Sequence, residues 1–326
     1  MTRTPLLFLL VSLAPMAVAE THPGEDAFIE KAVAEHGLDA ASVRALLGGA
    51  EFKQSIADAI ARPAEGKPWY DYRPIFITDQ RIAEGVAFWR ENEALINQVS
   101  EQFGVDPQFI VSIIGVETFY GRITGNYRVL DSLATLSFHY PSDRTRDRSE
   151  FFSSELMNYL LLGSEEELPL EEVTGSYAGA MGMGQFMPSS YRAYAVDFDD
   201  DGRRDLWRSR PDAIASVANY LAEHGWEAGG PVARRAKAGE GADFSLLKAG
   251  YKPELTVLDL HEKGYRSATD LDPEREAALV SLEQQDRDEY WMVFHNFYVI
   301  TRYNRSKMYA MAVYQLSEAL REGMAP

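Results

Sequence analysis

Four glycines fall within ten residues of the chain, in the run Gly-Ser-Tyr-Ala-Gly-Ala-Met-Gly-Met-Gly at positions 175–184. Glycine adopts backbone dihedrals that are closed to other residues and lets a ligand approach the backbone closely. Because so many glycines weaken regular helices and strands, this run predicts a loop that forms one wall of a ligand-binding cleft. Between Gly175 and Tyr194 the chain has no Asp or Glu. Acid chemistry at this wall therefore needs a carboxylate from elsewhere.

Glu117 is the candidate for that carboxylate. Asp106-Pro107 predicts a helix start, with Asp as the cap and Pro at the first helical position, and residues 109–116 are almost wholly apolar. A helix that is apolar all round is buried, so a carboxylate in its last turn before Gly121 is partly desolvated. Desolvation favours the protonated form of a carboxyl group and suits a general acid. The alternative is an exposed residue at a helix end.

An acidic loop follows the glycine-rich run, with the sequence Asp-Phe-Asp-Asp-Asp-Gly-Arg-Arg-Asp at 197–205. Acids at its positions one, three, five and nine, with Gly at position six, match the start of an EF-hand calcium loop. Position twelve is Arg208 instead of the usual Glu, and Asp212 is the best substitute for that ligand. We expect calcium to brace the cleft, and the alternative is a polar turn without metal. The predicted ligands are Asp197, Asp199, Asp201, Arg203 and Asp212.

Composition narrows the class of partner. The formal net charge is −18, which argues against nucleic acid and anionic membrane surfaces as partners. The six histidines lack zinc-ligand spacing. A serine nucleophile elbow and a phosphate-binding glycine loop are also missing from the sequence, so no organic cofactor is expected. The chain has no cysteine, which excludes a disulfide framework and a lipid-anchored N-terminal cysteine.

The first 19 residues are predicted to be a secretory signal peptide. Arg3 gives a positive start, Leu6–Leu13 form an apolar core, and Ala17–Ala19 provide a small-residue cleavage site. No later segment of the sequence is long and apolar enough to span a bilayer. We therefore expect a soluble periplasmic protein that is exported, cleaved near Glu20, and not a lipoprotein.

Apolar spacing predicts a mainly α protein of the α+β class. An aromatic loop is expected at 69–73, and short strands at 255–260 and 290–294 place a small β-containing unit at 227–295. The predicted helices lie within 26–61 and at 82–103, 107–121, 130–138, 151–162, 211–226 and 298–320.

Several runs of the chain, in this order, resemble the membrane-bound lytic murein transglycosylase B family, which is lysozyme-like in its core. The resemblance covers roughly residues 70–316 and implies a lysozyme-like helical core with an additional α domain and a small β-containing domain. The matching runs are 114–122, 130–136, 175–191, 194–198, 216–220 and 296–304. The expected domains are a signal peptide at 1–19, an N-terminal α segment at 20–80 that packs with a C-terminal helix at 296–326, a catalytic core at 81–226 with the EF-hand-like loop, and a small β-containing domain at 227–295.

The resemblance also implies roles for residues. Glu117 falls at the position of the family's single catalytic acid and base. Residues 142–146 look like an insertion where the family places paired arginines on the cleft rim, and Asp147 stands where a second arginine is expected. Ordinary core packing is the alternative role for the tyrosines. The implied substrate-binding residues are Ser176, Gln185, Phe186, Tyr72, Arg148, Tyr220, Tyr303, Asn304 and Tyr309.

The implied activity is that of a lytic transglycosylase. It cleaves the β-1,4 bond between N-acetylmuramic acid and N-acetylglucosamine in peptidoglycan glycan strands and leaves 1,6-anhydromuramyl products. Because the cleft runs carry no second acid, one Glu that acts first as acid and then as base fits better than the paired carboxylates of most glycosidases. The alternatives are a hydrolytic muramidase, with Asp131 or Asp143 positioning water, and a non-catalytic peptidoglycan-binding scaffold. The sequence identifies no partner among the proteins of cell-wall synthesis or division.

Overall fold

The computed structural model describes residues 21–62, 66–141 and 147–325. The predicted signal peptide at 1–19 and the segment 142–146 therefore lie outside the described residues. The described helices are α1 (Glu25–His36), α2 (Ala40–Gly48), α3 (Gln54–Ile60), α4 (Trp69–Phe76), α5 (Asp79–Glu91), α6 (Glu93–Phe103), α7 (Pro107–Thr118), α8 (Val129–Phe138), α9 (Ser149–Glu165), α10 (Pro188–Tyr194), α11 (Arg210–Glu223), α12 (Val257–Glu262), α13 (His295–Tyr303) and α14 (Lys307–Met324). The described strands are β1 (Tyr127–Arg128), β2 (Thr174–Gly175), β3 (Ala233–Ala238), β4 (Leu255–Thr256), β5 (Tyr265–Ser267), β6 (Glu276–Glu283) and β7 (Asp288–Val293).

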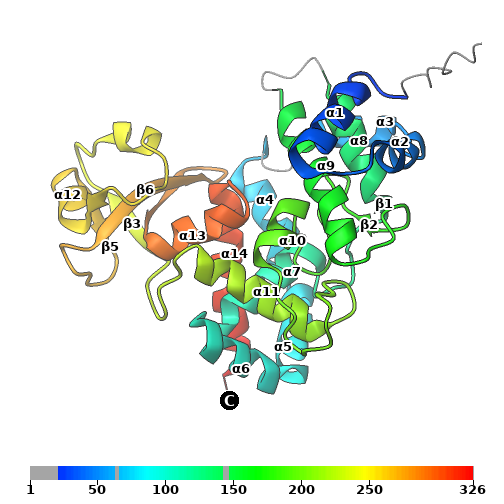
Figure 1. Ribbon diagram of the computed structural model, residues 1–326. Helices are drawn as coiled ribbons and strands as arrows, with labels where there is room; N and C mark the ends of the chain where they lie inside the picture. The colour runs from blue at the N-terminus through cyan, green and yellow to red at the C-terminus, as the bar shows by residue number, and fades with distance from the viewer. Residues whose placement is uncertain (1–20, 63–65, 142–146, 326) are drawn as a thin grey trace, which may run out of the picture.

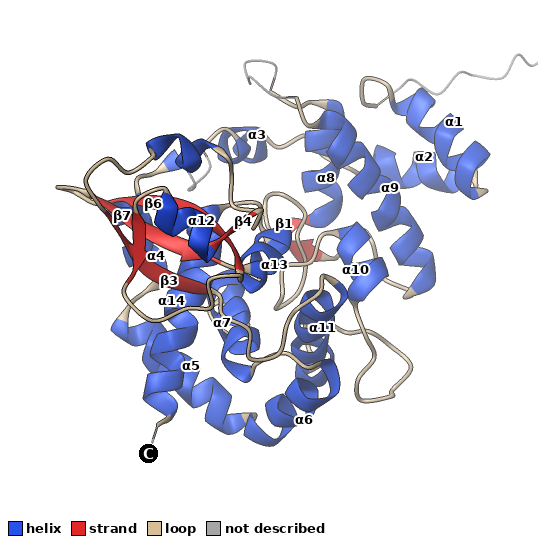
Figure 2. Ribbon diagram, turned by 90° about the vertical axis from the view of Figure 1, so that its left-hand side faces the viewer, coloured by secondary structure: helices blue, strands red, loops and turns tan. Residues whose placement is uncertain are grey.

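Helix α7 forms the centre of the helical body (Figures 1 and 2). Every residue from Phe109 to Val116 is buried, as the apolar sequence predicts. The helix packs against α5, α6, α11 and α14. These four neighbours fix the direction of α7 and the place where its last turn ends.

The start of α7 differs from the expectation in one respect. Asp106 is the N-terminal flanking residue, but its side chain makes no capping hydrogen bond. Its Oδ2 accepts instead from Trp226 Nε1 at 3.0 Å and from the Gly229 amide at 3.3 Å. The Trp226 ring packs on Phe109, with ring centroids 4.8 Å apart, and this contact brings its N–H to the carboxylate. Asp106 thus ties α7 to the segment that leads into the β unit.

Two predictions for the first half of the chain are wrong. The aromatic segment 69–73 is not a loop but the first part of α4, because Trp69 and Tyr72 lie one turn apart and are both buried. The single helix expected at 82–103 is two helices, α5 and α6, which meet at Asn92. Asn92 has non-helical dihedrals, and its side chain donates to the Phe88 carbonyl oxygen at 2.7 Å.

Two predictions for the second half also fail. The strand expected at 255–260 shrinks to the two residues of β4, because Thr256 and Asp259 form a capping box that starts α12. The C-terminal helix expected at 298–320 is divided into α13 and α14. The Ser306 side chain caps α14 by accepting from the Tyr309 amide.

The β unit at the left of Figure 1 is built on a five-stranded antiparallel sheet with the strand order β4-β6-β7-β3-β5. Strands β6 and β7 form a hairpin. Strand β7 overlaps the strand predicted at 290–294, and β4 is the first two residues of the strand predicted at 255–260. The unit has its own apolar cluster, which includes Val257, Tyr265, Leu279 and Met292.

The N-terminal helices pack in two places. Helices α1 and α2 contact one another and α3 contacts α8, whereas α4 packs on α14. The domain boundaries expected from the sequence stay a prediction. Among the described helices, none combines the length and the hydropathy that a membrane span requires.

Tyr120 occupies a space that two glycines leave open. A Cβ on Gly85 of α5 would lie 2.2 Å from Tyr120 Oη, and a Cβ on Gly115 of α7 would lie 2.6 Å from Tyr120 Cε1. The Tyr120 hydroxyl donates to the Arg81 carbonyl oxygen at 2.9 Å. The two glycines therefore allow α5 and α7 to close around this ring.

We expect Gly85→Ala to lower the free energy of unfolding by about 1–3 kcal/mol, because the added methyl group overpacks the Tyr120 site. Chemical denaturation monitored by circular dichroism measures the change. Gly48→Ala in α2 is the matched control, because nothing lies within 4 Å of its Cβ position. The control should keep or slightly raise stability, since alanine is the better helix former. Equal effects of the two substitutions would contradict the steric argument.

Candidate active site

Glu117 lies in the last turn of α7, where its side chain is half-buried. Its Oε1 accepts a hydrogen bond from Tyr309 Oη at 2.5 Å. Tyr309 belongs to the first turn of α14 and is 2% exposed. The buried helix and the buried phenol together hold the carboxylate in one place.

The chain turns sharply after Glu117. Phe119, Tyr120 and Gly121 have φ angles of 53°, 61° and 83°, so α7 ends at Thr118 and not at Gly121 as expected. Thr118 Oγ1 donates to the Met183 carbonyl oxygen at 2.8 Å and accepts from the Gly121 amide at 3.0 Å. Thr118 thus connects the end of α7 to the glycine-rich wall. The sequence interpretation missed this residue, and its place directly after Glu117 is the signal that could have identified it.

The glycine-rich wall starts at a close backbone contact. A Cβ on Gly125 would lie 2.0 Å from the Gly175 carbonyl oxygen, so no side chain fits at that point. The next residue, Ser176, accepts with its Oγ from the amides of Ala178 at 3.3 Å and Ala180 at 3.0 Å. Ser176 therefore shapes the turn of the wall itself.

Gln185 is held at the tip of a second tight turn. It has a φ of 52°, and the flanking residues Met181 and Phe186 exchange two backbone hydrogen bonds of 2.9 Å. Its amide nitrogen donates to the carbonyl oxygens of Thr124 at 3.1 Å and Gly182 at 3.0 Å. These bonds use only the amide nitrogen of the side chain.

An aromatic cluster links this wall to Tyr309. Tyr303 Oη donates to the Gly184 carbonyl oxygen at 2.5 Å, and the Tyr303 ring stacks with Tyr309 at 6.5 Å between centroids. Phe186 and Tyr220 pack on Tyr303 with centroids 5.8 Å and 4.7 Å away. The Tyr220 hydroxyl donates to the Arg302 carbonyl oxygen at 2.7 Å.

The two stacked phenols stay neutral. Burial raises the pKa of Tyr303 and of Tyr309 well above the usual value for tyrosine, and the charge of Glu117 raises both further. Both hydroxyls therefore act as hydrogen-bond donors, Tyr303 to Gly184 and Tyr309 to Glu117. Of the predicted substrate-binding residues, Phe186, Tyr220, Tyr303 and Tyr309 form one aromatic cluster that reaches Glu117 through Tyr309. Gln185 directly precedes Phe186 in the glycine-rich wall.

Three other predicted substrate-binding residues have different surroundings. Tyr72 is buried in α4, and its interaction with Tyr309 is one of the causes that raise the Tyr309 pKa. Asn304 is the residue that ends α13. Arg148 is exposed directly before α9, and its guanidinium lies 4.6 Å from the ring centroid of Phe151. The described contacts of Arg148 are thus with its own helix.

Asp131 is one of the two acids that the alternative muramidase mechanism would use to position water. The structure buries it in α8, where Oδ1 accepts from the Glu51 amide at 2.9 Å and lies 3.5 Å from Arg128. Its carboxylate therefore joins α8 to the N-terminal segment. The other acid, Asp143, lies outside the described residues.

The acidic loop brings three carboxylates together. Oxygens of Asp197, Asp199 and Asp212 all lie within 4.8 Å of one another. Asp212 is fully buried and accepts from the amides of Phe198 and Asp205, both at 2.8 Å. Burial chiefly raises the pKa of Asp212, and the charges of Asp199 and Asp197 raise it further. Three hard oxygen donors that repel one another fit a hard divalent cation.

Two further predicted ligands belong to the same loop. The Asp201 side chain accepts from the Arg203 amide at 2.9 Å and is not part of the three-carboxylate group. The amides of Asp201 and Gly202 donate to the Asp197 carboxylate at 3.1 Å and 2.9 Å. These bonds give the loop the closed shape of a cation-binding turn.

Comparison with known proteins identifies relatives over almost the whole chain. The family described as "Transglycosylase SLT domain" matches residues 20–318. Membrane-bound lytic murein transglycosylase B of Escherichia coli K12 is 42% identical over 309 residues, which are 92% of this chain and 83% of that protein. The crystal structure of soluble lytic transglycosylase SltB1 from Pseudomonas aeruginosa superposes with a TM-score of 0.84 at 45% identity and covers 92% of this chain and 99% of its own.

A third relative was solved as a calcium complex. The structure of Escherichia coli lytic transglycosylase Slt35 in complex with calcium has a TM-score of 0.82 at 41% identity, over 93% of this chain and 94% of its own. The mainly α (α+β) fold class and the family resemblance predicted from the sequence are confirmed by these matches.

Proposed function

The chain belongs to the SLT transglycosylase family and is a lytic transglycosylase that acts on peptidoglycan, and from this premise we propose that Glu117 is its single catalytic acid and base. One observation carries the proposal. Glu117 is positioned by a buried helix and by Tyr309 at a wall whose residues 175–194 include no Asp or Glu.

The proposed reaction cleaves the β-1,4 bond between N-acetylmuramic acid and N-acetylglucosamine. Glu117 first donates its proton to the glycosidic oxygen, the bond from that oxygen to the anomeric carbon breaks, and the acetamido oxygen of the muramic acid bonds to the anomeric carbon. The Glu117 carboxylate then takes the proton of the C6 hydroxyl. The C6 oxygen displaces the acetamido oxygen and closes the 1,6-anhydro ring. Glu117 ends the cycle protonated, and no water enters the product.

The residues around Glu117 supply binding and orientation. Tyr309 donates to one carboxylate oxygen and restricts its rotation. Since the Tyr220 hydroxyl is already bonded to a backbone carbonyl, we propose that its ring and not its hydroxyl supports the sugar. The other residues proposed to line the sugar-binding cleft are Ser176, Gln185, Phe186, Tyr72, Arg148, Tyr303 and Asn304.

We also propose that calcium binds at the acidic loop. The close carboxylates of Asp197, Asp199 and Asp212 support this, and a related structure contains calcium. The Asp201 carboxylate and the backbone carbonyl oxygen of Arg203, at positions five and seven of the loop, would complete the ligand set. The ion would offset the mutual repulsion of these acids and brace the loop behind the glycine-rich wall. Its role here is structural, because the proposed chemistry needs no Lewis acid.

Export to the periplasm is the last part of the proposal. The charge, apolar core and small-residue site of residues 1–19 support a cleaved signal peptide. The periplasm is where a peptidoglycan-cleaving enzyme meets its glycan strands.

We predict that Glu117→Gln lowers the rate of murein cleavage by about a thousandfold or more, since it removes both proton transfers. Digestion of purified murein, followed by mass spectrometry of the muropeptides, measures the rate and identifies the products. The wild-type enzyme should release 1,6-anhydromuramyl ends. Products heavier by one water, with reducing ends, would instead establish a hydrolytic muramidase. Full activity of the variant would refute the assignment of the acid.

Tyr309→Phe should lower kcat/KM about tenfold to a hundredfold, because it removes a hydrogen bond to a charged group. The bond favours the ionised carboxylate, so its loss should move the basic limb of the pH–rate profile to higher pH. Tyr303→Phe is the matched control, since its hydroxyl donates to the Gly184 carbonyl oxygen. A control that moves the limb equally would show that the effect comes from packing and not from the bond to Glu117.

Calcium should raise the melting temperature by roughly 5 °C at concentrations well above its dissociation constant, because a ligand that binds only the folded state stabilises it. Differential scanning fluorimetry with a chelator and with added calcium measures the shift. Asp199→Asn should abolish the shift. Asp200→Asn, a neighbouring exposed acid outside the three-carboxylate group, should keep it. A shift that survives in Asp199→Asn would place the ion elsewhere.

A further inference from the structure

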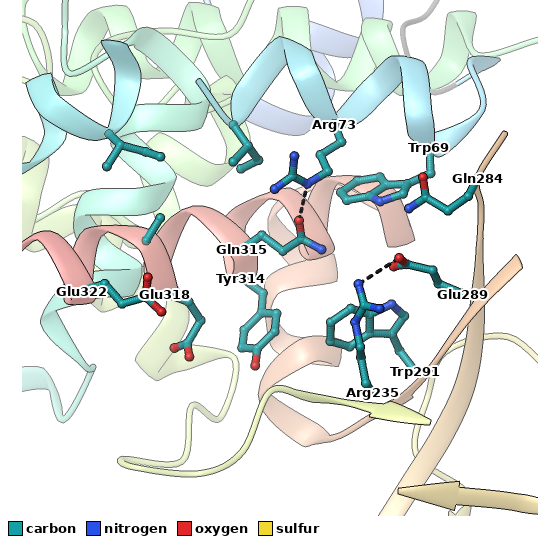
Figure 3. A pocket seen from close by; sticks show the side chains of 13 residues that line it. Trp69, Arg73, Arg235, Gln284, Glu289, Trp291, Tyr314, Gln315, Glu318 and Glu322 are labelled. Atoms are coloured by element: carbon teal, nitrogen blue, oxygen red, sulfur yellow. Dashed lines mark hydrogen bonds and ion pairs between the residues drawn. The ribbon is translucent and has the colours of Figure 1, made fainter. Parts of the chain in front are cut away.

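A second hollow lies among α4, α14 and the β6–β7 hairpin (Figure 3). It has a volume of about 610 Å³, which is typical of a small-molecule binding site. Its lining comes from segments far apart in the chain, with Trp69 on α4, Trp291 and Glu289 on β7, and Gln315 on α14. None of these residues belongs to the group around Glu117.

Three residues that line this pocket each have a buried polar atom without a hydrogen-bond partner among the described residues. These atoms are Trp69 Nε1, Trp291 Nε1 and Glu289 Oε2. The two tryptophans are 1% and 7% exposed. Nearly all buried polar groups in proteins are paired, so two donors and one acceptor left over in one pocket point to a ligand that supplies the missing partners.

The other contacts of these side chains keep them in position. Trp69 stacks on Tyr72 at 6.1 Å between centroids. The Arg235 guanidinium lies 5.1 Å from the ring centroid of Trp291 and donates to Glu289 Oε1 at 2.8 Å. In Figure 3 the two indoles lie on facing sides of the pocket, with Gln284 near Trp69 and Glu289 near Trp291. The unpaired atoms are therefore fixed before a ligand arrives.

Charge favours a neutral ligand. The pocket is lined by two arginines, Arg73 and Arg235, and three glutamates, Glu289, Glu318 and Glu322, and Arg235 is already paired with Glu289. A strongly charged ligand would meet repulsion from one of these sets. An adjoining hollow of about 390 Å³ shares Arg73, Gln284 and Glu289 with this pocket, so the ligand can extend beyond one sugar ring.

The required chemistry is that of an N-acetylated sugar. Its acetamido carbonyl oxygen and ring hydroxyls accept hydrogen bonds from indole N–H groups, and a hydroxyl donates to the free oxygen of Glu289. A free peptide has carbonyl oxygens too, but its terminal carboxylate would face Glu318 and Glu322.

We propose that this pocket is a second carbohydrate-binding site, which holds a neutral N-acetylhexosamine unit of a glycan strand away from the Glu117 cleft. The proposal rests on the action of the enzyme on peptidoglycan and not on the role of Glu117. Trp69 packs on Tyr72, and Tyr72 interacts with Tyr309, the donor to Glu117. The second site therefore adjoins the cleft through α4.

The test is nuclear magnetic resonance of the ¹⁵N-labelled Glu117→Gln protein, titrated with the β-1,4-linked tetramer of N-acetylglucosamine. The chain has five tryptophans, so five indole N–H signals are expected, and Trp69→Phe and Trp291→Phe each assign one. We expect these two signals to shift saturably. Trp89, buried in α5 outside the pocket, is the matched control and should not shift.

A second variant and a second probe make the result decisive. At a fixed sugar concentration below saturation, Glu289→Ala should reduce the sugar-induced chemical-shift change of the two indole signals at least fivefold. It should leave the sugar-induced shifts of the amides at 175–184 unchanged. It keeps both tryptophans, so the test survives if a tryptophan variant fails to fold. The proposal is overturned if only the 175–184 amides respond or if no signal moves at millimolar sugar. A peptidoglycan stem peptide that alone moves the two indoles would overturn it in favour of a peptide site.

Discussion

The burial of α7 on all sides is the constraint on which the rest of the structure depends. Its residues from Phe109 to Val116 are buried, and α5, α6, α11 and α14 pack against it. A helix enclosed in this way cannot rotate or slide without opening the core. Glu117, in its last turn, therefore has a fixed position, and a fixed position is what the two proton transfers proposed for it need.

The neighbours of Glu117 support the proposal that a single carboxylate acts as both acid and base. Tyr303 and Tyr309 are neutral donors, one bonded to the glycine-rich wall and the other to Glu117. They bring polar hydrogen atoms to the cleft without adding a second charge. Asp131, the described acid that could have provided one, is used in the contact between α8 and Glu51. In the proposed mechanism, orientation and proton transfer are thus performed by different residue types.

The sequence alone predicted the features that are formed by residues close together in the chain. The apolar run identified the central helix, and the Asp-rich spacing identified the loop that gathers Asp197 and Asp199. Tyr309 donates to a residue 192 positions away, so only the family resemblance could select it among 17 tyrosines. The pocket lined by Trp69 and Trp291 could not be predicted from the sequence either, because its residues come from distant parts of the chain. The sequence analysis missed the capping box of Thr256 and Asp259, although both residues stand at the spacing that such a box requires.

The strain after α7 shows how these parts depend on one another. Phe119 and Tyr120 both adopt left-handed dihedrals, and each such residue costs about 1–3 kcal/mol unless its surroundings require it. Here the surroundings do. The Arg81 guanidinium lies 4.7 Å from the Phe119 ring centroid, and the Tyr120 ring fills the space above Gly85 and Gly115. This turn is what directs Thr118 to the Met183 carbonyl oxygen. Core packing around Phe119 and Tyr120 therefore offsets the strain of the turn that connects α7 to the glycine-rich wall.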